Sequence, residues 1–252
     1  MIASQYIPNP MLIDDYKFDL RVYVGITSIN PLRIYIYEEG LTRFATVKYN
    51  QTSKKQSKYV HLTNYSLNKF NANFVNNTDA DVDDQGSKWS ITALRRKMQA
   101  IGIDHERIFK KIEDIIIKTI LAGENVINNA TEMFVPYPNN CFELLGFDIL
   151  IDDTYEPWLL EVNLSPSLNC DSPLDQKIKA NVITDLFNLA GMVHLDERGV
   201  SDQSNTKKLL SAYTAGSVSM AHDVPNSTNI GPVKSVARRS ANGGVQGRKG
   251  SV

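Results

Sequence analysis

Two hydrophobic runs between residues 141 and 167 constrain the fold of this chain more than any other stretch. They flank a polar turn at residues 152–157, and this pattern predicts a β-hairpin with a longer loop. If the two strands are symmetric about the turn, Asp148 on the first strand lies directly opposite Glu161 on the second. The chain is therefore expected to contain an antiparallel sheet in which two carboxylates face each other.

The polar residues of this hairpin predict a metal site. In the same register Asn163 lies opposite Gly146, and Glu161 and Asn163 share one face because side chains alternate along a strand. Opposed carboxylates repel, which destabilises a sheet unless a cation lies between them. Three oxygen ligands suit Mg²⁺, and Gly146 would leave space for a ligand. The expected metal ligands are Asp148, Glu161 and Asn163.

Length and composition limit the class of protein. The 252 residues allow one large domain or two small ones, and a hydrophobic fraction of 42% allows a real core. The only cysteines, Cys141 and Cys170, indicate neither a disulfide framework nor a zinc site. Pro8 and Pro10 interrupt any signal-like apolar run, and no stretch is long enough to span a bilayer. A soluble intracellular protein is expected.

The charge of the chain is distributed unevenly. Residues 199–252 carry seven Lys or Arg and two Asp, a net charge of +5, although the whole chain carries −1. This segment is rich in Ser, Asn, Gly and Ala, so residues 196–252 are expected to be a basic disordered tail after a folded domain at 1–195. The tail either attracts an acidic partner or is solvated without one.

Hydrophobic periodicity predicts an α+β fold in which an antiparallel sheet packs with helices. Ser90 and Ser172 are expected to cap helices, and residues 30–31 and 39–40 are expected to be turns. The predicted elements are a meander of strands at 18–24, 33–38 and 42–49, a strand ending near 61–66, a loop at 68–87, and helices at 90–100, 104–133 (one helix or two) and 172–190.

Several cations have two interpretations. Lys17, Asp19 and Arg21 share one strand face; the pattern alone favours a solvated face, and the alternative is the wall of a site. Arg43 lies on an otherwise apolar face, where an unpaired charge is costly. Lys179 lies beside the apolar stripe of the last helix and either snorkels outward, which the pattern favours, or points at a buried anion. Together with the metal ligands, these cations fit phosphoryl transfer.

Several ordered motifs resemble the tubulin tyrosine ligase-like family, in particular its glutamylase branch. The resemblance covers roughly residues 5 to 191. The motifs are KFDLRVYV, LTRFATVKY, HLTNYS, CFELLGFDILID, WLLEVNLSPSL and DSPLDQKIKANVITDLF.

The resemblance implies a fold, an activity and partners. It implies the C-terminal portion of an ATP-grasp fold, and an ATP-dependent ligase that adds glutamate to glutamate side chains of tubulin C-terminal tails through an acyl phosphate. The implied cofactors are ATP and Mg²⁺. The implied partners are tubulin or microtubules and free L-glutamate, with no nucleic acid and no membrane. The implied location is the cytoplasm and cytoskeleton, extending to the cilium or basal body.

The resemblance also implies roles for individual residues. It assigns Mg²⁺ to Asp148, Glu161 and Asn163, in agreement with the hairpin argument. The other implied roles are nucleotide binding by Gln5, Tyr6, Ile7, Lys17, Asp19, Thr63 and Asn64, binding of the incoming glutamate by Arg43, Tyr65, Lys88 and Lys179, and catalysis by Arg21, Arg43 and Lys179.

The chain departs from the family pattern because it begins at the adenine-lining segment. We therefore expect no complete ATP site in this chain alone, and robust ATP-dependent glutamate incorporation into tubulin would contradict that expectation. Two other functions stay open from the sequence. One is ligation of glycine, or ligation to a non-tubulin protein; the other is an inactive microtubule-binding fragment.

Overall fold

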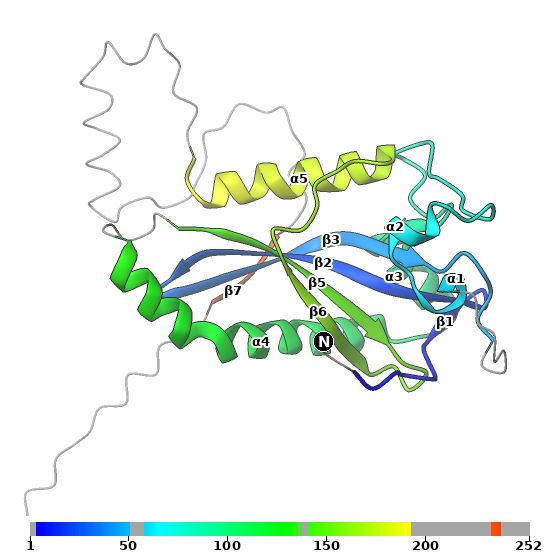
Figure 1. The fold of residues 1–252 in the computed structure, drawn as a ribbon, viewed down its shortest axis with the longest axis horizontal. Helices are drawn as coiled ribbons and strands as arrows, with labels where there is room; N and C mark the ends of the chain where they lie inside the picture. The colour runs from blue at the N-terminus through cyan, green and yellow to red at the C-terminus, as the bar shows by residue number, and fades with distance from the viewer. Residues whose placement is uncertain (1–3, 51–57, 136, 138–140, 193–232, 238–252) are drawn as a thin grey trace, which may run out of the picture.

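The computed structural model describes residues 4–50, 58–135, 137, 141–192 and 233–237. Within these residues one antiparallel sheet of seven strands runs in the order β4-β3-β2-β5-β6, with β1 paired to β2 and β7 paired to β3 (Figure 1). The strands are β1 (Leu12–Ile13), β2 (Tyr16–Ile29), β3 (Leu32–Phe44), β4 (Lys88–Ser90), β5 (Glu143–Ile151), β6 (Pro157–Leu164) and β7 (Val233–Ala237). The predicted antiparallel sheet is confirmed.

Helices cover both faces of the sheet. The helices are α1 (Lys58–His61), α2 (Tyr65–Asn68), α3 (Ile91–Ala100), α4 (His105–Phe134) and α5 (Pro173–Leu189). In Figure 1, α4 runs along one side of the sheet and α5 along the other. None of the helices in the described ranges combines the length and apolarity needed to cross a membrane.

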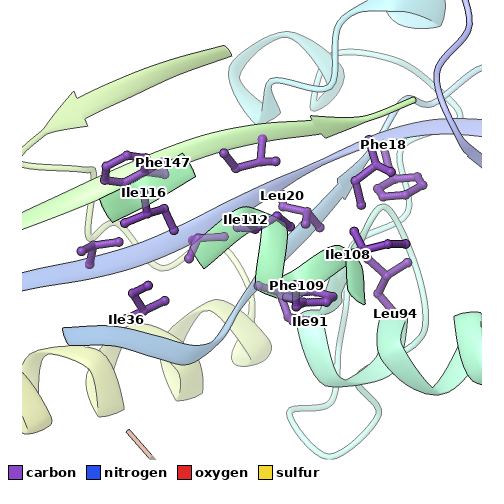
Figure 2. Packing of buried hydrophobic residues seen from close by; sticks show 14 of the residues in the cluster. Phe18, Leu20, Ile36, Ile91, Leu94, Ile108, Phe109, Ile112, Ile116 and Phe147 are labelled. Atoms are coloured by element: carbon purple, nitrogen blue, oxygen red, sulfur yellow. The ribbon is translucent and has the colours of Figure 1, made fainter. Parts of the chain in front are cut away.

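The larger core lies between the sheet and helices α3 and α4. Phe18 and Leu20 of β2 pack there with Phe147 of β5 against Ile112 and Ile116 of α4 (Figure 2). Burial of these side chains away from water is the main favourable term in folding. The predicted strand at 18–24 is confirmed as part of β2, and its apolar residues face this core.

A smaller core lies on the opposite face of the sheet. There Tyr23 and Leu41 pack against Leu174, Ile178 and Val182 of α5. Since side chains alternate along β2, the charged residues that neighbour Tyr23 on its face lie under the same helix. This face carries the candidate site.

The prediction of two strands at 33–38 and 42–49 is wrong, because β3 is one strand that ends at Phe44. No turn forms at residues 39–40. The Glu39 carboxylate instead accepts hydrogen bonds from the first backbone N–H groups of α3, at Ile91 (2.7 Å) and Thr92 (3.2 Å). A Cβ on Gly40 would collide with the Arg21 carbonyl oxygen, so glycine is needed there for close approach of two strands.

The predicted helices are confirmed, and α4 is a single helix. Ser90 and Ser172 cap α3 and α5 by accepting hydrogen bonds from Ala93 and Asp175 backbone N–H groups. The prediction of a strand end near 61–66 is wrong, because this segment runs from the last residue of α1 into α2. The Asn68 amide donates to the backbone carbonyls of Leu62 and Asn64 and holds the segment in a compact loop.

The basic tail lies outside the described residues except for β7. The segment was expected to be disordered, yet these residues pair antiparallel with Arg33–Tyr37 of β3. β4 pairs with Leu41–Arg43 of β3, so β4 leaves the backbone groups of Arg33–Tyr37 on the same edge available to β7.

Candidate functional site: a charged sheet face beneath helix α5

The hairpin of β5 and β6 has the predicted register at its polar residues. Asp148 pairs with Glu161, and Gly146 pairs with Asn163. The register shifts immediately beyond Asp148, which marks a bulge between these pairs and the turn. The Asn163 amide donates to the Gly146 carbonyl (3.2 Å) and to Glu161 Oε1 (3.3 Å). The hairpin thus holds two carboxylates and an amide close together at the sheet edge.

Strand pairing extends this charged row across the sheet. Arg21 of β2 pairs with Asp148 of β5, and Asp19 of β2 pairs with Arg43 of β3. Arg43 in turn pairs with Lys88 of β4. Directly paired residues project on the same side of a sheet, so all five strands of the main path contribute charged side chains to one face.

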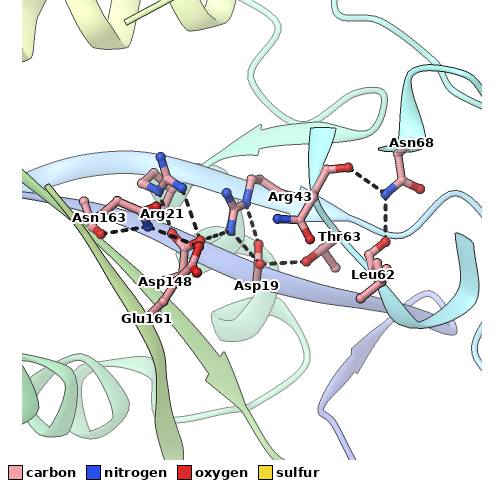
Figure 3. Close-up of polar contacts among 11 residues, drawn as sticks. Asp19, Arg21, Arg43, Leu62, Thr63, Asn68, Asp148, Glu161 and Asn163 are labelled. Carbon is pink, nitrogen blue, oxygen red and sulfur yellow. Dashed lines mark hydrogen bonds and ion pairs between the residues drawn. The ribbon is translucent and has the colours of Figure 1, made fainter. Parts of the chain in front are cut away.

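Two arginines hold the Asp148 carboxylate (Figure 3). Arg21 donates from Nε to Oδ1 (2.6 Å) and from Nη2 to Oδ2 (3.2 Å), while Arg43 Nη2 donates to Oδ2 (2.8 Å). Burial alone would raise the pKa of Asp148, but the Arg21 hydrogen bonds and the Arg43 charge hold this pKa below its usual range. Asp148 is therefore an ionised carboxylate although it is only 2% exposed.

The expectation that Gly146 leaves space for a ligand is wrong. A Cβ at this position would approach the Pro166 ring within 2.9 Å and Arg21 Cδ within 3.2 Å. The missing side chain makes room for the Pro166 ring and for the Arg21 side chain, which reaches Asp148. Gly146 therefore serves the ion pair.

Arg43 links this pair to a second carboxylate. It donates from Nε to Asp19 Oδ1 (2.7 Å) and from Nη2 to Asp19 Oδ2 (2.6 Å), and Thr63 Oγ1 donates to the same Oδ2 (2.6 Å) (Figure 3). Burial lowers the pKa of Arg43, but Asp19 and Asp148 outweigh it and raise this pKa overall. Thr63, Asp19, Arg43, Asp148 and Arg21 form one continuous network.

The prediction that the Lys17, Asp19 and Arg21 face is solvated is wrong. Lys17 is 7% exposed and Asp19 is 3% exposed, because α5 and the segment that contains α1 and α2 cover this end of the sheet. Such coverage depends on residues far away in sequence, so the strand pattern alone does not reveal it. The alternative interpretation, the wall of a site, agrees with the structure.

Two lysines meet at a third buried carboxylate, that of Asp175. Lys88 Nζ donates to Asp175 Oδ2 (2.6 Å) and lies 3.9 Å from the centre of the Tyr65 ring. Lys179 Nζ lies 3.5 Å from Asp175 Oδ1 and donates to the Asn169 carbonyl. The outward orientation favoured for Lys179 is wrong, and the alternative of a buried anion is confirmed.

Asp175 is the important residue that the sequence interpretation missed. Its position in the sequence shows only that it belongs to the first turn of the helix that Ser172 caps, whereas in the structure it is fully buried between two site lysines. The Asp175–Lys179 spacing of four residues on one helix was the available signal.

Of the other residues expected near a nucleotide, Lys17 lies beside Tyr6, whereas Asp19 and Thr63 belong to the Arg43 network. The Tyr6 hydroxyl hydrogen-bonds to His61 Nδ1 (2.6 Å), and its ring centre lies 4.9 Å from Lys17 Nζ. Burial lowers the pKa of Lys17, against the opposing effect of Asp19. Within the described part of the chain the Lys17 side chain makes no hydrogen bond. The side chains of Gln5, Ile7 and Asn64 contact neither the network around Arg43 nor the lysines around Asp175 in that part of the chain.

The chemistry of the hairpin fits a hard cation. Asp148, Glu161 and Asn163 offer oxygen ligands only, which suits Mg²⁺. Among the described residues no group of three His, Cys, Asp or Glu side chains is placed to hold a metal, so a cation here would depend on the amide of Asn163 as well as on the two carboxylates.

Comparisons with known proteins agree with the resemblance seen in the sequence. Residues 1–199 match the model of the tubulin-tyrosine ligase family. The chain is 54% identical over 197 residues to tubulin polyglutamylase TTLL5 of Mus musculus, covering 78% of this chain and 15% of that protein. It is 46% identical over 194 residues to tubulin monoglutamylase TTLL4 of Homo sapiens, covering 77% and 16%.

A relative from Caenorhabditis elegans is also named as a tubulin polyglutamylase. Tubulin polyglutamylase ttll-5 of Caenorhabditis elegans is 44% identical over 200 residues, which is 79% of this chain and 27% of that protein. The chain thus spans about 15% of the length of the TTLL5 relatives that it matches. The family match covers most of the folded residues and all of the charged face, and this chain belongs to the tubulin-tyrosine ligase family.

Proposed function

We propose that this chain supplies the metal and amino-acid side of an ATP-dependent ligase that joins glutamate to glutamate side chains of tubulin tails. The relatives described above are named for tubulin glutamylation, and the family match supports a ligase. In this proposal residues 1–195 are the C-terminal portion of an ATP-grasp domain. Residues 196–252 are a basic segment that would attract the acidic tails of tubulin, and the chain would act on the cytoskeleton.

The observation that carries the proposal is the gathering of buried cations on one sheet face beside the polar hairpin. Lys17, Arg21, Arg43, Lys88 and Lys179 come from β2, β3, β4 and α5 and lie at most partly accessible to water. Three buried aspartates, Asp19, Asp148 and Asp175, offset part of this charge, and the two positive charges left over are costly to bury unless further anions bind them. ATP phosphates and the carboxylates of glutamate are anions of the required kind.

The residues divide into three groups with different tasks. Lys17, beside Tyr6, has donors available for phosphate oxygens, and Asp19 and Thr63 fix the neighbouring strand and loop. Asp148, Glu161 and Asn163 would hold Mg²⁺, which supplies charge neutralisation at the phosphates when it is bound.

The remaining residues face the amino acid. Arg43, Lys88 and Lys179 would bind the carboxylates of the incoming glutamate, with Tyr65 packed against Lys88. Arg21 would orient Asp148 and the acceptor carboxylate.

The reaction proceeds in two steps in this proposal. A side-chain carboxylate of the tubulin tail takes the terminal phosphoryl group of ATP, which gives an acyl phosphate and ADP. The amine of free glutamate then attacks the acyl carbon, phosphate leaves, and an isopeptide bond remains. The cations on the sheet face stabilise the negative charge that develops on oxygen in both steps.

Amino-acid selectivity tests the proposal. Calorimetric titration of the chain with L-glutamate, glycine and L-tyrosine, in the presence of ATP and Mg²⁺, should show tighter binding of L-glutamate because it has a second carboxylate. Equal affinity for glycine would contradict the glutamate assignment. Incorporation of labelled glutamate into microtubules, with and without ATP, reports on the complete reaction.

A further inference from the structure

Asp171 and Asp175 contact the same lysine from different environments. Asp175 is fully buried and accepts a hydrogen bond from Lys88 at 2.6 Å. Asp171 lies 3.8 Å from Lys88 Nζ, and its side chain is 32% exposed. Asp175 thus contacts the Lys88 ammonium group from the protein interior, and Asp171 approaches the same group from the solvent side.

Asp175 is well fixed in the helix. It is the third residue after the Ser172 cap, its backbone N–H donates to Ser172 Oγ (3.2 Å), and Ser172 Oγ lies 3.3 Å from its Oδ2. These contacts place its carboxylate between Lys88, which comes from β4, and Lys179, which lies one turn along α5. Without this carboxylate the two buried ammonium groups would have no shared anion to offset their repulsion.

The three buried side chains keep one surplus positive charge. Two ammonium groups and one carboxylate leave a net charge of +1. An ammonium group has three N–H donors. Lys88 uses one on Asp175, and Lys179 uses one on the Asn169 carbonyl, so within the described residues each has two donors without a hydrogen-bond acceptor. This arrangement matches the charge and the acceptor oxygens of one carboxylate.

We propose that Asp175 is a positioning residue that holds Lys88 and Lys179 together as the receptor for one carboxylate of the incoming amino acid, and that Asp171 competes with that carboxylate for Lys88. The inference rests on the proposed binding of glutamate at this face. It goes further by giving opposite roles to two aspartates that contact the same lysine. If only the negative charge of the two aspartates mattered, both would have the same role, because either charge would weaken the binding of an anion.

Two matched variants separate these possibilities. In Asp175→Asn the lysines lose their shared anion, and we expect the Kd for L-glutamate to rise by about tenfold, the size of one charge-assisted hydrogen bond. In Asp171→Asn a partly exposed competitor is removed, and we expect the Kd to fall by about two- to fivefold. Kd values that change in the same direction in both variants would overturn the inference.

A second readout does not depend on ligand. Acetylation of Lys88 by an amine-reactive reagent, followed by mass spectrometry, should be faster in Asp175→Asn than in the unmodified chain and little changed in Asp171→Asn. Unchanged labelling in Asp175→Asn would overturn the positioning role. If labelling changes as expected and no variant binds glutamate, the assignment of glutamate fails while the holding of the two lysines stands. Circular dichroism of both variants checks whether the fold is retained.

Discussion

Arg21 and Asp148 form a two-point ion pair between neighbouring strands, with Nε–Oδ1 and Nη2–Oδ2 distances of 2.6 and 3.2 Å. The pair joins two sequence motifs that are 127 residues apart. It also places a guanidinium on the carboxylate that is proposed to bind Mg²⁺. The protein thus has its own counter-ion at this position, and the consequences for stability are measurable.

Asp148→Asn should destabilise the fold strongly. The change leaves the buried Arg43 and the partly buried Arg21 with one carboxylate fewer, and breaking a buried ion pair typically costs about 3–5 kcal/mol. Urea denaturation measures the free energy of unfolding. Asp114→Asn is the matched control, because Asp114 pairs with Lys118 on the exposed side of α4. Similar losses in the two variants would contradict the importance of the buried network.

The contribution of Asp148 should depend on pH. Its pKa in the folded chain is lowered from 3.8, so its ionised form is the one that stabilises the fold. The stabilisation is complete above the unfolded-state pKa and is lost as pH falls through the lower folded-state pKa. The difference in unfolding free energy between the unmodified chain and Asp148→Asn should therefore be constant near neutral pH and shrink below about pH 4. A difference that grows with acidity would contradict this assignment.

Asp185 should show the opposite pH dependence. It lies on the buried side of α5, its Oδ2 has no hydrogen-bond partner among the described residues, and burial raises its pKa. Because its folded-state pKa is raised, the contribution of Asp185 to stability is complete below its unfolded-state pKa and is lost as pH rises through its folded-state pKa. Asp185→Asn should thus stabilise the chain by about 1 kcal/mol at neutral pH, the scale of an unsatisfied buried group.

The same pair of chains provides the check on Asp185. The gain in Asp185→Asn should disappear in denaturation experiments at about pH 3, where a carboxyl group of ordinary pKa is protonated. A gain that is equal at both pH values would show that the charge of Asp185 is not its source, and a loss at neutral pH would show that Asp185 has a charged partner in solution.

Gly40→Ala should disturb both fold and site. The new Cβ would collide with the Arg21 carbonyl oxygen and approach Ile91 Cδ1 within 2.7 Å, so β2 would have to shift at the residue that binds Asp148. Overpacking of this kind costs about 1–3 kcal/mol in thermal or urea denaturation. Gly123→Ala is the contrasting change, because its Cβ meets only Ile127 at 3.8 Å and alanine favours a helix by about 1 kcal/mol. Equal effects of the two changes would contradict the close packing at Gly40.

The sequence was sufficient where local chemistry determines the structure. A polar turn and symmetric flanking strands gave the pairing of Asp148 with Glu161, and capping residues gave the starts of α3 and α5. It failed at residues 39–40, because Glu39 and Gly40 have the composition of a turn but serve a helix cap and a close strand contact. Distant partners determine both roles.

The candidate site was less accessible to sequence reasoning than the fold. The burial of Lys17 and Asp19 depends on the covering of β2 by distant segments, and the partner of Lys88 lies 87 residues away at Asp175. Periodicity describes one element at a time, so it cannot show which charges from different elements converge. The family resemblance singled out most of these residues, and the structure supplies their mutual contacts.

Binding of Mn²⁺ tests the central claim, that the hairpin is the metal end of a ligase site, most directly. Electron paramagnetic resonance should detect one Mn²⁺ bound per chain and displaced by Mg²⁺. Binding should be lost in Glu161→Gln and retained in Glu132→Gln, a change on the exposed surface of α4. Glu161 is exposed, so its substitution leaves the core intact. The account would be contradicted if the unmodified chain binds no Mn²⁺, or if Glu161→Gln binds Mn²⁺ as well as the unmodified chain does.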